Sequence, residues 1–245
     1  MLRHYSFKQK AMMVINLIFY ILFAVMVIYA AIHNGGDLSS ILFVIVGLVC
    51  LVFGILSEYL KYQYNEALWY LNFKLDTKKA KEIYENMLKK DIFGMYKNDR
   101  ALFDVMVAIE EKDGNRALKI IEENEKKFNS NVETLLIRLY YEMRACLLTG
   151  KDKKINELYN DVKNIEKMKK RPKIFQYDEL DGIYERARKN RSLAFEHFQK
   201  VNTAYMNPKE TKFILENLVL LAPAEQKAYY QEDMKRLEGL INESK

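Results

Sequence analysis

The side chains that could carry out chemistry are few and widely spaced in this sequence. The histidines are His4, His33 and His197, and the cysteines are Cys50 and Cys146. A metal centre or a Cys–His nucleophile needs such groups side by side, and only Cys146 and His197 could meet within one folded domain. There is no phosphate-binding glycine loop, GxSxG elbow or HExxH motif. We therefore expect no metal, no cofactor and no enzymatic activity.

Carboxylates are the other candidates for chemistry. Acidic residues cluster at Glu110-Glu111, at Glu122-Glu123 and around Glu179. Two carboxylates can serve as a general acid and a general base. On exposed helices, however, such residues are usually solvated or paired with basic side chains one turn away. We interpret them as surface charge, so that the expected function is recognition rather than catalysis.

Two long apolar runs stand at the front of the chain, before the segment that carries most of the charged residues. The first extends from Ala11 to Ile32 and the second from Leu38 to Ser57, with a short polar break between them. A bilayer core needs about 20 helical residues, whereas the apolar part of a signal peptide has only about 7–15. We predict membrane helices at about residues 11–33 and 38–60, and a soluble domain at residues 61–245.

Basic residues predict the orientation of this membrane hairpin. Arg3, Lys8 and Lys10 precede the first run and Lys61 follows the second, while the loop between the runs carries only Asp37. Short cytoplasmic segments are enriched in Lys and Arg. We therefore expect a cell-membrane protein with two spans and with both termini in the cytoplasm.

Small and polar residues recur along both runs. They are Asn16, Ala24 and Ala31 in the first run and Gly47, Cys50 and Gly54 in the second. Small residues allow membrane helices to approach closely, and an amide can bond to a neighbouring helix. We predict that these six residues pack the hairpin on itself, the alternative being a contact between two copies. Neither apolar run holds Asp, Glu, Lys or Arg, which argues against a transporter or proton channel.

The charge of the chain indicates which classes of partner it could bind. The formal net charge is +6, and the basic residues are interspersed with many acidic ones. Such a balance suits a position near anionic lipid and lacks the concentrated basic patch of nucleic-acid binders. The basic run from Lys163 to Lys173 is interpreted as a solvated helix end and loop, or alternatively as a contact for lipid headgroups or an acidic partner.

Regular breaks divide the soluble part into helical segments. They fall at residues 75–77, 112–115, 149–152 and 189–192, with a last break at Pro223. After each of the first four breaks a small or aliphatic residue is followed four positions later by a bulky one. These pairs are Ala80 and Tyr84, Ala117 and Ile121, Ile155 and Tyr159, and Ala194 and Phe198, with offsets of 37, 38 and 39 residues. The period predicts an all-α fold with an α-solenoid of about five helical hairpins, the alternative being a generic helical bundle.

This pattern resembles a divergent tetratricopeptide repeat array over roughly residues 64–240. The family also begins its second helix with a small residue and places an aromatic residue four positions later. The departures are a spacing longer than the usual ~34 residues and the scarcity of the family's Trp, Gly and Pro, apart from Trp69, Gly182 and Pro208. The resemblance implies that the first helices line a concave groove for a peptide or a partner helix.

Candidate groove residues lie on the expected first helices. They are Asn65, Trp69, Asn72, Tyr141 and Arg144. Tyr, Trp and Arg provide much of the binding energy in protein interfaces. The alternative is that Trp69 and Tyr141 pack between repeats. The last pair, residues 209–221 and 224–241, is expected to cap the array.

We therefore expect a membrane-anchored cytoplasmic scaffold or adaptor that binds a protein or peptide through a helical-repeat groove. The alternatives are an accessory subunit of a larger membrane complex for export or secretion, and a peptide-sensing regulator. The expected partners are a cytoplasmic protein or peptide and the lipid bilayer, with no nucleic acid and with assembly into homo- or hetero-oligomers. A composition rich in Lys, Ile and Asn is typical of low-GC bacteria.

Overall fold

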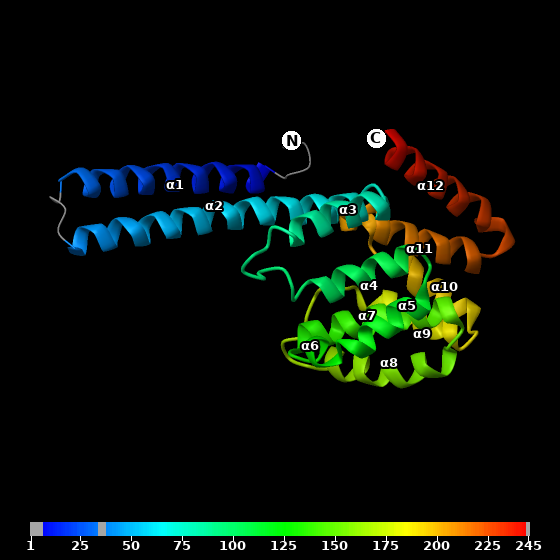
Figure 1. Ribbon diagram of the computed structural model, residues 1–245. Helices are drawn as coiled ribbons and strands as arrows, with labels where there is room; N and C mark the ends of the chain where they lie inside the picture. Colours follow the sequence, from blue (N-terminus) through cyan, green and yellow to red (C-terminus); the bar gives the residue numbers. More distant parts are fainter. Residues whose placement is uncertain (1–6, 34–37, 244–245) are drawn as a thin grey trace. The chain divides into compact units, whose positions relative to one another are not determined.

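The computed structural model describes residues 7–33 and 38–243, and within these ranges every regular element is helical (Figure 1). Contacts divide the chain into two compact units. We call residues 1–69 and 82–91 the hairpin unit, and residues 70–81 and 92–245 the helical-pair unit.

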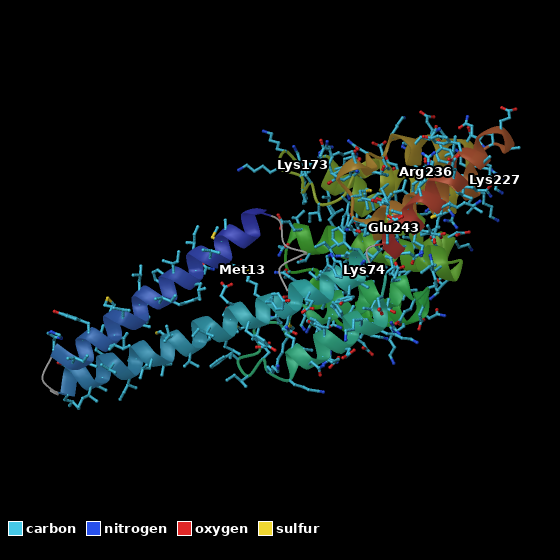
Figure 2. All side chains as sticks on the ribbon, turned by 90° about the horizontal axis from the view of Figure 1, so that it is seen from above. Met13, Lys74, Lys173, Lys227, Arg236 and Glu243 are labelled. Carbon is cyan, nitrogen blue, oxygen red and sulfur yellow. The ribbon has the colours of Figure 1, made fainter. Side chains whose placement is uncertain are left out.

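Two long helices form most of the hairpin unit, α1 (Phe7–His33) and α2 (Leu38–Asn72). Both are long and apolar enough to cross a membrane, and only 6% of the most apolar stretch of each is buried. Figure 2 shows side chains made almost entirely of carbon along α1 and the first part of α2. The core helix of a soluble protein would bury such a surface, so these helices are apolar without being covered by protein.

Helix α2 continues beyond the apolar run. It was expected to end near residue 60, but it extends to Asn72 without interruption. The residues from 55 to 72 include neither glycine nor proline, and nothing in this stretch provides a helix stop signal. The expected boundary between residues 60 and 61 thus falls inside a helix, and the segment expected to be the first helix of the first repeat is the end of α2.

Helix α3 (Thr77–Leu88) runs back along α2. The ring centroids of Tyr64 and Tyr84 are 6.0 Å apart. Just beyond α3, Lys90 Nζ donates to Tyr59 Oη at 2.6 Å. Because the contact on α2 moves from Tyr64 to Tyr59 as the chain advances from Tyr84 to Lys90, the two helices are antiparallel.

The helical-pair unit continues with further antiparallel pairs. Its elements are α4 (Arg100–Glu110), α5 (Gly114–Glu123), α6 (Glu125–Phe128), α7 (Val132–Thr149), α8 (Asp152–Glu166), α9 (Tyr177–Ala187), α10 (Arg191–Lys200), η1 (Thr203–Tyr205), α11 (Pro208–Leu221) and α12 (Ala224–Glu243). The pairs are α4 with α5, α7 with α8, α9 with α10, and α11 with α12. The second helix of each of the first three pairs also contacts the first helix of the next pair. First helices touch as well, α4 with α7 and α7 with α9.

The same turn closes the first helix of four successive pairs. A residue with positive φ occurs at Leu75 (53°), Lys112 (59°), Gly150 (67°) and Lys189 (63°). In three of these turns the next backbone N–H reaches the carbonyl five residues earlier, in the pattern of a Schellman motif. These bonds are Asp113 to Ala108 at 2.9 Å, Lys151 to Cys146 at 3.0 Å and Asn190 to Glu185 at 2.9 Å. The left-handed residues are 37, 38 and 39 positions apart, which matches the period in the sequence.

The core lies where the second helices begin. Five residues after each left-handed residue stand Ala80, Ala117, Ile155 and Ala194, all with 0% of their surface exposed. Longer connections join successive pairs, such as residues 167–176 and 201–207. Within the described residues of α12, only Ile241 is buried, as suits a terminal helix.

Candidate functional site

A pocket of about 260 Å³ opens on the first helices of the helical-pair unit. Its apolar wall consists of Ile109, Leu147, Leu148, Phe213 and Leu220. Its polar wall consists of Lys112, Arg144, Arg186, Glu216 and Asn217. These residues come from α4, α7, α9, α11 and the turn after α4. The pocket is thus assembled from four helical pairs, and no single pair could form it.

The repeat geometry determines part of this lining. Ile109, Leu147 and Arg186 each stand three residues before a left-handed residue. They therefore occupy the same position in three successive pairs and project toward the same side. An arginine in this position, where the two preceding pairs have aliphatic residues, brings a charge into an otherwise apolar row.

Arg144 is the most deeply buried cation of the pocket, with 6% of its surface exposed. Its Nη1 donates to Tyr140 Oη at 2.9 Å, and its Cζ lies 3.8 Å from the ring centroid of Phe213. Its Nε is buried without a hydrogen-bond partner in the described structure. A buried donor without a partner costs about 1–3 kcal/mol.

A buried acid lies behind Arg144. Tyr140 donates to Glu179 Oε1 at 2.6 Å, and Glu179 is 1% exposed. Burial raises the pKa of Glu179 to about 7, although Arg144 and the Tyr140 hydrogen bond oppose the shift. Burial also lowers the pKa of Lys209 to about 8, with a further contribution from the nearby Arg144. Because Glu179 is only partly ionised near neutral pH, it does not fully balance the charge of Arg144.

The other two cations of the pocket have partners that leave part of their hydrogen-bonding capacity unused. Lys112 Nζ pairs with Glu216 at 2.9 Å. Arg186 Nη1 donates to Asn217 Oδ1, a neutral group. Three cations therefore face one carboxylate across an apolar surface. This combination suits an anionic group attached to an apolar chain, such as the side chain of a glutamate or a carboxyl terminus.

Of the five groove residues expected from the sequence, only Arg144 lines this pocket. Asn65, Trp69 and Asn72 all lie on α2. Tyr141 is 7% exposed, and its ring lies edge-on to that of its neighbour Tyr140, with ring centroids 5.0 Å apart.

Several pocket residues were missed by the sequence analysis. They are Lys112, Arg186, Phe213, Glu216 and Asn217. A signal for Arg186 was present, since it follows Leu147 by one repeat offset. The residues of α11 had no such signal, because their approach to α7 and α9 depends on how the pairs stack.

In the hairpin unit, two of the expected packing residues press α1 against α2. A Cβ at Gly47 would lie 2.7 Å from Val27 Cγ2, and a Cβ at Gly54 would lie 2.5 Å from Tyr20 Cε1. Glycine is thus required by close approach at both positions. Of the remaining expected residues, Ala24 is partly buried, whereas Ala31 and Cys50 are exposed.

A polar pair joins the two long helices. Asn16 Nδ2 donates to Glu58 Oε1 at 2.8 Å. The pair borders a largely apolar pocket of about 300 Å³, which Met13, Tyr20 and Ile55 also line. Glu58 lies beyond the apolar run, and it enters this contact because α2 continues past residue 57 as a helix.

Among the residues that the structure describes, Asp178, Asp181 and His197 form a cluster whose residue types could bind a metal. His197 Nδ1 lies 3.3 Å from Asp178 and 4.0 Å from Asp181. Asp181 already accepts from Tyr159 Oη at 2.7 Å and pairs with Lys163 at 3.0 Å. Tyr159 and Lys163 thus already engage the Asp181 carboxylate.

The basic run that starts at Lys163 is otherwise exposed. Lys167, Lys169, Lys170 and Lys173 all have exposed side chains. Figure 2 shows Lys173 extending away from the helices. Lys163 itself belongs to the ion pair with Asp181, so the run is not a single uniform patch.

No protein-family model, curated protein or solved structure matches this chain. Its function has to be inferred from its own geometry.

Proposed function

We propose that this protein is a membrane-anchored scaffold whose helical pairs bind an acidic segment of a partner protein. One observation carries the proposal, the pocket on the first helices in which Lys112, Arg144 and Arg186 face the single carboxylate of Glu216. The apolar wall would receive the aliphatic or aromatic side chains next to the acidic group. Recognition therefore needs both a charge and an apolar neighbour.

The membrane anchor is supported by the two apolar helices, whose most apolar stretches are only 6% buried. The basic residues on either side of the hairpin favour an orientation with both termini in the cytoplasm. The helical-pair unit would then meet its partner in the cytoplasm. The hairpin would fix the location of binding, and the pocket would fix what is bound.

The repeat architecture supports a groove-binding role. The left-handed turns at intervals of 37, 38 and 39 residues and the buried small residues after them favour an α-solenoid of the tetratricopeptide type. In that family the first helices line the concave groove. The pocket opens on the first helices here, so its position agrees with that mode of binding.

The two other functions expected from the sequence gain no specific support. An accessory subunit of an export complex would offer Gly47 and Gly54 to another membrane protein, but both glycines face α1 of the same chain. A peptide-sensing regulator would need two states of the array, and nothing in the described structure favours a second state.

Selection of peptides tests the proposal. The full-length protein in lipid nanodiscs would be used to select binders from a displayed random peptide library. We expect the selected peptides to be rich in Asp and Glu beside apolar residues. Loss of one charged hydrogen bond costs about 1.5–3 kcal/mol, so Arg186→Gln should weaken binding by roughly 10- to 100-fold.

A matched control lies two residues away on the same segment. Arg188 is 53% exposed, stacks over Tyr184 and does not line the pocket. Arg188→Gln should therefore leave the affinity unchanged. Selected peptides without acidic residues, or an equal loss of affinity in the two variants, would refute the proposal.

A further inference from the structure

Helix α3 returns the chain to the apolar end of α2. Lys90 lies just beyond this helix and donates to Tyr59, with its Nζ 4.8 Å from the centroid of the Tyr59 ring. Tyr59 follows the second apolar run almost directly, since that run ends at Ser57. A tyrosine in this position is typical of the boundary between a membrane helix and water. The chain therefore leaves α3 at the level where α2 would leave the bilayer.

Two large apolar side chains follow at this point. Ile92 is 73% exposed and Phe93 is 57% exposed. Ile92 is two residues from Lys90, so their Cα atoms can be no more than about 8 Å apart. Covalent connection alone thus keeps this apolar pair near the boundary marked by Tyr59.

The charges around the pair suit an anionic surface. Lys89, Lys90 and Lys97 have exposed side chains. The acidic residue beside them, Asp91, is only 4% exposed. The loop thus presents apolar tips and ammonium groups while its nearest carboxylate is turned inward. This is the pattern of a segment that inserts shallowly among lipid headgroups.

We infer that residues 89–97, which we call the interfacial loop, insert Ile92 and Phe93 into the headgroup boundary of the membrane that the hairpin spans. Lys89, Lys90 and Lys97 lie among the phosphates of anionic lipids. The occupant of this surface is the bilayer and not a protein. The inference rests on the proposed membrane anchor, and it adds a second lipid contact that the sequence analysis did not assign.

Quenching by brominated lipid tests the insertion. Trp69, the single tryptophan of the chain, is first replaced by phenylalanine. Phe93→Trp is then introduced into this full-length background, in nanodiscs of phosphatidylcholine and phosphatidylglycerol. We expect a blue-shifted emission and quenching of about twofold or more by bromine placed near the top of the acyl chains.

A second reporter separates the two proposals. Phe53→Trp in the same background places the tryptophan on an exposed part of α2 within the apolar run. Quenching of Phe53→Trp without quenching of Phe93→Trp would overturn the interfacial loop and leave the anchor intact. Absence of quenching in both would overturn the anchor and the interfacial loop together.

Proteolysis provides an independent readout. Trypsin should cut at Lys89, Lys90 and Lys97 about 10-fold more slowly than at the exposed residues 169–170 of the same nanodisc-bound chain, because lipid covers the interfacial loop. A variant with Ile92→Ser and Phe93→Ser should lose this protection, while cleavage at residues 169–170 stays the same. Equal cleavage rates at the two segments of the wild-type protein would contradict the inference.

Discussion

The two units of this molecule place their large apolar side chains in opposite ways. In the hairpin unit the large apolar side chains point outward, and the contact between α1 and α2 uses Gly47, Gly54 and the Asn16–Glu58 bond. In the helical-pair unit the apolar side chains are buried, and even Arg144 lies inside. The proposed membrane anchor accounts for the difference, because in lipid there is no hydrophobic drive between helices, and close approach and polar bonds have to hold them.

Truncation of a large apolar side chain should show the largest difference in stability between the two units. Phe198 is fully buried against Gly182 of the preceding helix. Phe198→Ala should cost about 3–5 kcal/mol of unfolding free energy. Leu22 is 63% exposed on α1. Leu22→Ala should lower the unfolding free energy by less than about 1 kcal/mol, because lipid replaces the lost contacts.

Denaturant unfolding of the full-length protein in micelles, followed by circular dichroism, measures both changes. A large loss in Leu22→Ala would mean that protein covers this face of α1. A small loss in Phe198→Ala would mean that the second helices do not hold the array together.

The buried charge of the helical-pair unit should make its stability depend on pH. The pKa of Glu179 is about 7 in the folded protein, against an ordinary value of 4.5. The folded state therefore binds more protons between these values, and the unfolding free energy falls as the pH rises through this window, by up to about 3 kcal/mol. Glu179→Gln should remove this slope, because glutamine does not titrate.

Denaturant titrations at several pH values between 4.5 and 7 would compare the two proteins. Parallel profiles for the wild type and Glu179→Gln would show that Glu179 is ionised in the folded state throughout. Lys209 acts in a different window, since its pKa is lowered to about 8, so its contribution to the stability rises with pH between 8 and its ordinary value of 10.5.

Overpacking at the glycines between α1 and α2 tests the contact within the hairpin unit. Gly54→Leu would push a side chain into the ring of Tyr20, and overpacking of this kind costs about 1–3 kcal/mol. Cys50→Leu places the same side chain on the exposed side of α2 and should change little. Energy transfer between probes at the ends of α1 and α2 would report the separation of the two helices. An equal change in this separation in both variants would argue against close contact at Gly54.

Local signals made part of this structure predictable from the sequence. Asp, Asn, Thr and Gly at the breaks act within a few residues, so the turns and the buried Ala117 and Ala194 could be assigned by counting. The continuation of α2 could have been inferred from the missing stop signal, but the change in composition at Glu58 suggested a boundary instead. The pocket could not be inferred in this way, because Arg144 meets Phe213 through the stacking of separate pairs.

The smallest expected effect distinguishes two uses of glycine. Gly150 has a φ of 67° and open space where a Cβ would lie, whereas Gly54 is required for close approach. Lys189 occupies the equivalent left-handed position with a side chain. Lys189→Gly should therefore stabilise the protein by about 0.5–1 kcal/mol, and Gly150→Ala should destabilise it by about 1 kcal/mol, through backbone conformation alone.

For a chain of this size these changes correspond to shifts in Tm of about 2–4 °C per kcal/mol, which thermal unfolding can detect. Opposite signs in Lys189→Gly and Gly150→Ala would show that the repeated turn limits the stability of the helical pairs through the φ of one residue. Equal signs would mean that the side chain of Lys189 stabilises its turn by more than the left-handed backbone costs. Opposite signs would thus assign Gly150 to backbone conformation, in contrast to Gly54, which serves the contact between α1 and α2.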